Sequence, residues 1–148
     1  MNTRRIGFAR LAAVAGAIAI LGGCQQMNHM MGQGDNHVTL TGANEVPPVS
    51  TSASGRAEVK VRADRTVDVE VHVSGMTPTA AHIHEAAAGA NGPVIVPLNK
   101  VSDSKFESAA GAKLTEAQYE SYKAGRTYVN VHSAKNPGGE IRAQLKGN

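Results

Sequence analysis

Two segments in the middle of the chain alternate strictly between apolar and polar residues. Residues 56–62 place Ala57, Val59 and Val61 on one side, and residues 66–74 do the same with Val67, Val69, Val71 and Val73. A period of two is typical of an antiparallel sheet with one face in water, because successive side chains of a strand point to opposite faces. Asp64 and Arg65 between the segments suit a hairpin turn.

Further strand-like runs follow at short intervals and are separated by Gly, Pro and Asn. They cover residues 37–41, 81–85, 94–98, 105–109, 127–133 and 140–146. This spacing favours a β-sandwich or a closely related barrel. One helix is expected over residues 114–125, since Thr115 and Gln118 fit a capping box and Gly125 can end the helix. We therefore expect an all-β, antiparallel, Greek-key-like β-sandwich with one short helix.

The N-terminus has the pattern of an export signal. Arg4, Arg5 and Arg10 precede a short apolar stretch over residues 11–21. Leu21-Gly22-Gly23-Cys24 resembles a bacterial lipobox, which implies cleavage of residues 1–23 and lipidation of Cys24. The alternative is a plain secretory signal followed by an incidental Cys. Gln25 does not resemble the Asp that retains lipoproteins in the inner membrane. A lipid anchor in the outer membrane, facing the periplasm, is therefore expected if the cell has two membranes.

Charge must be counted after this cleavage. The whole chain has 15 Lys and Arg against 12 Asp and Glu, and the only charged residues that are lost with the signal peptide are Arg4, Arg5 and Arg10. The expected mature chain is thus balanced, and it has no basic run with interleaved aromatics, so no nucleic-acid partner is expected. Residues 24–36 form the expected tether, with residues 37–148 as the domain. The tether contains thioether and imidazole side chains that suit Cu(I): Met27, His29, Met30 and Met31. The alternative is that this segment is a plain polar linker.

Three histidines form the candidate site. His82 and His84 are two residues apart in a strand-like run, so their rings should share a face about 6.5 to 7 Å apart. His132 lies in a second run, on a face with Tyr128 and Asn130, which are candidate hydrogen-bond partners of the ligands. If the two runs are neighbours, the three imidazoles make a metal site. Otherwise they are polar faces of two ordinary strands.

Other polar residues are assigned different roles. Glu85 alternates away from the two histidines before it and is not expected to be a ligand. His72 shares a face with Asp68 and Glu70 and is expected to be solvated. Glu45, Glu140 and Arg142 are expected to fix loops through hydrogen bonds and ion pairs.

Several motifs together resemble the CHRD (chordin-type) domain over about residues 37–147. They are residues 40–49 (LTGANEVPPV), 81–84 (AHIH), 91–93 (NGP), 128–133 (YVNVHS) and 136–142 (NPGGEIR). The resemblance implies an extracytoplasmic β-sandwich of immunoglobulin-like or superoxide-dismutase-like type. It implies little about activity.

A second resemblance is local. His82-Ile83-His84-Glu85 is similar to the strand that supplies copper ligands in copper/zinc superoxide dismutases, and His132 can stand for a later copper histidine. No further histidines are placed for a bridging ligand or a zinc subsite. The likeness therefore supports metal binding by His82, His84 and His132 more than dismutation.

Three functions remain open at this point. The first is a lipoprotein that binds a metal ion for storage, delivery or tolerance, with copper as the expected ion and zinc as the alternative. The second is a structural or protein-interaction domain at the cell envelope, with no metal and an unknown protein partner. The third is a copper-dependent, superoxide dismutase-like enzyme. Catalysis ranks behind binding, because no other catalytic arrangement can be placed in the sequence.

Overall fold

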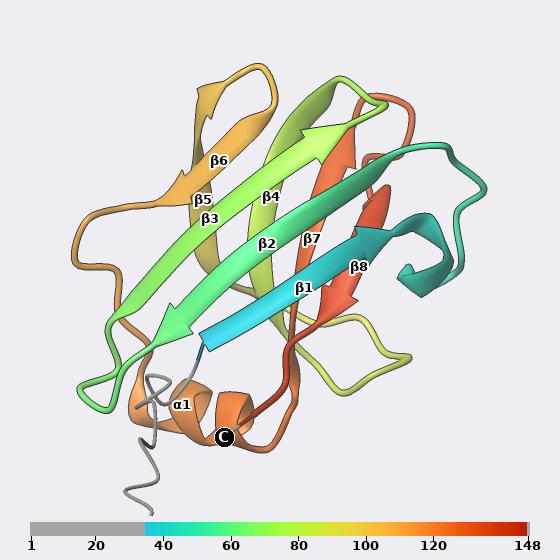
Figure 1. The fold of residues 1–148 in the computed structure, drawn as a ribbon. Helices are drawn as coiled ribbons and strands as arrows, with labels where there is room; N and C mark the ends of the chain where they lie inside the picture. Colours follow the sequence, from blue (N-terminus) through green and yellow to red (C-terminus); the bar gives the residue numbers. More distant parts are fainter. Residues whose placement is uncertain (1–34, 148) are drawn as a thin grey trace, which may run out of the picture.

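The structure is a computed structural model that describes residues 35–147, and Figure 1 shows its arrangement. Eight strands and one α-helix make up the fold. In chain order they are β1 (Asp35–Thr41), β2 (Ser54–Val61), β3 (Val67–Ser74), β4 (Pro78–Glu85), β5 (Val94–Ser102), β6 (Lys105–Ser108), α1 (Glu116–Lys123), β7 (Thr127–Ser133) and β8 (Ile141–Gln144), with a single 3₁₀ turn, η1 (Gly42–Asn44), after β1. The expected signal peptide, Cys24 and most of the expected tether lie outside the described residues.

The strands form one closed antiparallel barrel in the order β1-β2-β3-β6-β5-β4-β7-β8. The all-β class and the short helix are confirmed, and the architecture is the barrel that the strand spacing left open, not the β-sandwich that we expected. Thr41 of β1 pairs with Arg142 of β8, which joins the two ends of the sheet. Alternation along a strand fixes which face is buried, but it does not determine whether the sheet closes.

Two connections give the barrel its Greek-key character. β3 pairs with β6 rather than with β4, and β4 pairs with both β5 and β7. In each case a strand lies beside another that is three places away in the sequence, which is the spatial order of a Greek key. The second of these connections brings residues 78–85 against residues 127–133.

The barrel interior is filled by the alternating apolar positions. The valines of β2 and β3 are buried as predicted, and β4, β7 and β8 add Ala81, Ile83, Val129, Val131, Ile141 and Ala143. β5 is longer and more exposed than predicted. β5 continues to Ser102, beyond the predicted end at Leu98, and its outer residues Val94 and Val101 are 46% and 50% exposed.

The helix closes one end of the barrel. Thr115 accepts a hydrogen bond from the Gln118 backbone N–H, and the Gln118 side chain accepts one from the Thr115 N–H, so the predicted capping box is confirmed. Tyr122 is buried, and its hydroxyl accepts a hydrogen bond from Asn36 at 2.8 Å. Asp35 and Asn36 therefore belong to β1 and not to the expected tether.

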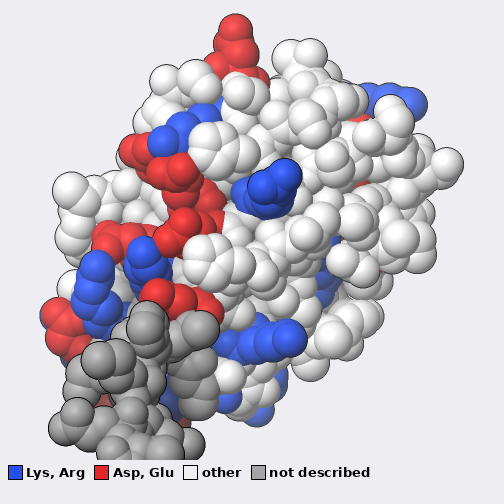
Figure 2. Space-filling view, viewed as in Figure 1, with Lys and Arg blue, Asp and Glu red and all other residues white. Residues whose placement is uncertain are grey.

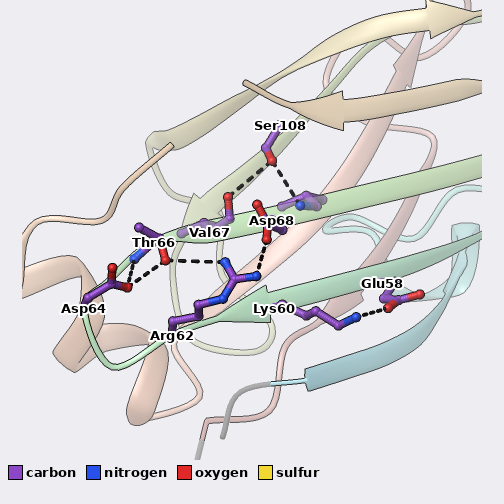
Figure 3. A network of polar contacts seen from close by, with 9 residues as sticks. Glu58, Lys60, Arg62, Asp64, Thr66, Val67, Asp68 and Ser108 are labelled. Carbon is purple, nitrogen blue, oxygen red and sulfur yellow. Dashed lines mark hydrogen bonds and ion pairs between the residues drawn. The ribbon is translucent and has the colours of Figure 1, made fainter. Parts of the chain in front are cut away.

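Charged side chains of both signs lie side by side on the outer face of β2, β3 and β6 (Figure 2). Lys60 pairs with Glu58 at 2.7 Å and Arg62 with Asp68 at 2.6 Å, as Figure 3 shows. His72 lies 2.6 Å from Glu70 and is exposed, which confirms that it is solvated. Exposed pairs of this kind add little stability but keep the face soluble. No helix within residues 35–147 is long and apolar enough to cross a membrane.

Candidate metal centre

The β4–β7 pairing brings the three histidines together. Ala80 of β4 is opposite His132, and His82 is opposite Asn130. Ala81 and Ile83 point into the core with exposed fractions of 0% and 2%, so the alternating His82 and His84 lie on the outer face of the barrel. The prediction that the two runs are neighbours is confirmed.

The three rings are close enough to share one ion. One ligand nitrogen from each of His82, His84 and His132 lies within 4.8 Å of the others. Nδ1 of His82 is 3.0 Å from Nε2 of His132, which is a hydrogen bond between the two rings. Two nitrogens that bind one Zn or Cu ion at about 2.0 Å can be at most about 4 Å apart, so a separation near 4.8 Å would have to shrink through a small ring movement when an ion binds.

Backbone carbonyls set the tautomers of two of the rings. Nδ1 of His84 lies 2.9 Å from the Gly92 carbonyl oxygen, and Nδ1 of His132 lies 2.9 Å from the Pro137 carbonyl oxygen. A carbonyl oxygen can only accept, so each Nδ1 donates and each Nε2 carries a lone pair. This is the arrangement in which proteins commonly present histidine to a metal.

His84 Nε2 has no hydrogen-bond partner although it is buried. Buried polar atoms are nearly always paired, because an unpaired one loses its hydration without compensation. The residue as a whole is only 8% exposed. A lone pair held dry and unpaired beside two other imidazoles is the strongest sign of a ligand site in this structure.

The rings are held neutral. Burial, together with the neighbouring His132 and His84, lowers the pKa of His82 to about 4. Burial also lowers the pKa of His84 and of His132, against the opposing hydrogen bonds to their backbone carbonyls. Because a metal binds neutral imidazole, the site is ready for an ion well below neutral pH.

The Gly92 carbonyl can reach His84 only because residue 92 has no side chain. A Cβ at Gly92 would lie 1.8 Å from the Glu85 carbonyl oxygen. The loop after β4 therefore folds back tightly onto its own strand. The sequence indicated a turn at Asn91-Gly92-Pro93, but it gave no sign that this turn anchors a histidine.

Tyr128 and Asn130 surround the ligands, as expected from their shared face. The Tyr128 ring stacks on His84, with centroids 4.8 Å apart and planes 4° apart. Its hydroxyl accepts a hydrogen bond from the Gly92 N–H at 3.3 Å. Asn130 is 2% exposed, and its amide raises the pKa of His84, against the dominant effect of burial.

Behind this layer lies a polar cluster that the sequence did not reveal. The Arg142 guanidinium carbon lies 3.3 Å from the centre of the Tyr128 ring. Glu45 is buried next to Gly139, where a Cβ would come within 2.6 Å of its Oε1. The sequence predicts only loop fixing for Arg142 and Glu45, and no pattern in it connects them to the histidines.

The remaining polar residues are placed elsewhere. Glu85 accepts a hydrogen bond from Ser121 at 2.5 Å, which supports its exclusion as a ligand. Glu140 accepts hydrogen bonds from Thr51 and Ser133 and fixes loops as expected. Cys24, Met27, His29, Met30 and Met31 lie outside the described residues.

Comparison with known protein families identifies the family of the chain. A protein-family profile for the CHRD domain matches residues 37–145. The chain belongs to the CHRD domain family. No curated protein and no solved structure matched the chain.

The CHRD motifs converge on the histidines. Asn91 donates to the Val46 carbonyl at 2.7 Å and accepts from Arg142 at 3.0 Å, which links three motifs far apart in the sequence. Asn44 donates to the Arg142 carbonyl at 3.2 Å. The loops of this CHRD domain thus form a single hydrogen-bonded support over β4, β7 and β8.

Proposed function

We propose that this CHRD protein is an exported, lipid-anchored metal-binding protein that holds copper through His82, His84 and His132. Its role would be copper storage, delivery or tolerance at the cell envelope. The observation that carries the proposal is the buried, unpartnered Nε2 of His84 beside two further neutral imidazoles.

Copper is favoured over zinc by two arguments from the sequence. The Met and His residues of the expected tether suit Cu(I), and the expected extracytoplasmic location exposes the domain to copper. Zn(II) also accepts three imidazoles with an open fourth position, so it is the competing ion. Lipidation at Cys24 and the outer-membrane location rest on the lipobox resemblance.

The test is metal titration of the full chain and of a triple variant, His82→Ala/His84→Ala/His132→Ala. Cu(I), Cu(II) and Zn(II) are each titrated against a competing chelator. Because both proteins keep the tether, the difference between them isolates the barrel site. His72→Ala is the matched control, since His72 is a solvated histidine on another face.

One additional tight copper equivalent in the parent and in His72→Ala, absent from the triple variant, supports the proposal. Each single His→Ala change should weaken binding, with the fold unchanged by circular dichroism. Equal metal binding by the parent and the triple variant would refute the metal-binding function.

The second candidate is a structural or protein-interaction domain without metal. The observation in its favour is the direct hydrogen bond between His82 and His132, which satisfies both atoms without an ion. In that case the triple variant would lose stability rather than metal binding.

A superoxide dismutase-like enzyme is the third candidate. Three ligands leave a position open for a small oxidant. Among residues 35–147, the three histidines are the only group of three or more His, Cys, Asp or Glu side chains close enough to share a metal ion. No second metal subsite therefore supports a dismutase. It requires turnover above that of free copper, lost in His132→Ala.

A further inference from the structure

Arg142 is a buried cation whose partners are all neutral. It is 2% exposed, and its guanidinium donates to Asn91 Oδ1 at 3.0 Å, the Ala90 carbonyl at 2.8 Å and Gln144 Oε1 at 3.4 Å. Within residues 35–147, no carboxylate forms an ion pair with it among the salt bridges of the structure. Its charge is therefore not cancelled by direct contact.

This charge is separated from the histidines by one aromatic ring. Tyr128 belongs to β7, which lies between β4 and β8, so its ring contacts His84 from one neighbouring strand and Arg142 from the other. No layer of water lies in this stack, since Tyr128 is 2% exposed. Charge interactions through such a dry path are several times stronger than through bulk solvent.

Glu45 is the acidic group that faces Arg142. It is buried, and burial raises its pKa to about 7 against the opposing charge of Arg142. Near neutral pH it therefore offsets only part of the arginine charge. The other titratable groups near Arg142 are Tyr128, whose ring it contacts, and the histidines on the far side of that ring.

We propose that Arg142 is a specificity-determining residue, which makes the three-histidine site hold Cu(I) in preference to Cu(II). The inference rests on the proposed function and deepens it by naming the form of copper bound. A fixed positive charge repels a dication about twice as strongly as a monocation at the same place. Three neutral imidazoles add no negative charge that would favour the dication.

The experiment measures the ratio of Cu(I) to Cu(II) affinity in the full chain, with the signal of the triple histidine variant subtracted. Arg142→Gln removes the charge. Asn91→Asp keeps Arg142 but replaces the amide oxygen that accepts its hydrogen bond with a carboxylate, which offsets the arginine charge. Because Asn91 is exposed, this variant tests the inference even if Arg142→Gln does not fold. Arg142→Lys keeps the charge and is the matched control.

Both neutralising variants should lower the affinity ratio by about tenfold or more, which for one electron is a fall in copper potential of about 59 mV. Arg142→Lys should stay within about threefold of the parent on the same argument. If copper binds the histidines but Asn91→Asp leaves the ratio unchanged, the role of Arg142 is overturned and the metal function stands. If copper does not bind the parent, both are overturned.

Discussion

Replacing Glu45 by Gln should make the protein more stable at alkaline pH. Glu45 is 5% exposed, and its Oε1 has no hydrogen-bond partner. Burial raises its pKa from 4.5 to about 7, although Arg142, the Val46 backbone N–H and Asn130 all act to lower it. Gln has nearly the same shape and cannot ionise, so the change isolates the cost of the carboxylate.

The sign follows from proton linkage. Between about pH 4.5 and pH 7 the unfolded chain has released the proton of Glu45 while the folded protein still holds it. The free energy of unfolding therefore falls as pH rises through this window and levels off above it. At 1.36 kcal/mol for each pKa unit, the cost above pH 7 reaches an upper value of about 3 kcal/mol. The free energy of unfolding of Glu45→Gln should not show this fall with rising pH.

Urea denaturation of parent and variant at several pH values between 4.5 and 8.5 checks the prediction. The gain in unfolding free energy of Glu45→Gln over the parent should grow by about 1 to 3 kcal/mol across that range. The histidines titrate in both proteins, so their contribution cancels. Parallel pH profiles would refute the reasoning.

Glu140→Gln is the control with the opposite sign. Burial would raise the pKa of Glu140, but hydrogen bonds from Ser133 and Thr51 outweigh it and lower the pKa. The ionised form thus stabilises the fold above the pKa of the unfolded chain, and this contribution is lost as pH falls. Glu140→Gln should therefore be destabilising, and more so at pH 8 than at pH 4.5.

Three further predictions concern the histidine site. Gly92→Ala should lower the free energy of unfolding by about 1 to 3 kcal/mol, because its Cβ would lie 1.8 Å from the Glu85 carbonyl, whereas Gly138→Ala, with nothing within 4 Å, should be nearly neutral in thermal melts. Tyr128→Leu should lower the free energy of unfolding by about 2 to 3 kcal/mol, because it removes the ring that stacks on His84. Tyr128→Phe should lower it by only about 1 kcal/mol, because only the hydrogen bond from Gly92 is lost, and equal losses in the two variants would contradict the stack. The copper affinity should fall far less between pH 7.5 and pH 5.5 than it would for three imidazoles of ordinary pKa, since all three histidine pKa values are lowered, that of His82 to about 4, and fewer protons compete for the rings; a fall as steep as that of ordinary imidazoles would contradict the lowered pKa values.

Most of the strands could be predicted because their signal is local. The alternation in residues 56–62 and 66–74 and the capping box at Thr115 depend on neighbours within a few residues, and β2, β3 and α1 were found where expected. The choice between a sandwich and a closed barrel could not be made from the sequence, because closure depends on the pairing of Thr41 with Arg142, about a hundred positions apart. No local pattern encodes that contact.

The candidate site divides in the same way. The spacing of His82 and His84 and the polar face of His132 marked the ligands, since side-chain direction follows from strand period alone. The Gly92 and Pro137 carbonyls that set the ring tautomers could not be foreseen. Backbone atoms of loops have no signature in a sequence, because every residue supplies the same carbonyl.

The sequence by itself determined the strand faces, the helix cap, the three histidines and the CHRD motifs, since each depends on residue type and spacing along one segment. Only the tertiary structure decided that β4 and β7 are neighbours, that His84 Nε2 is buried without a partner, and that Arg142 lies behind Tyr128. These features arise from strand pairing and loop closure over long distances in the chain. The chemistry of the site depends on burial and unbalanced charge, which exist only once those segments are packed together.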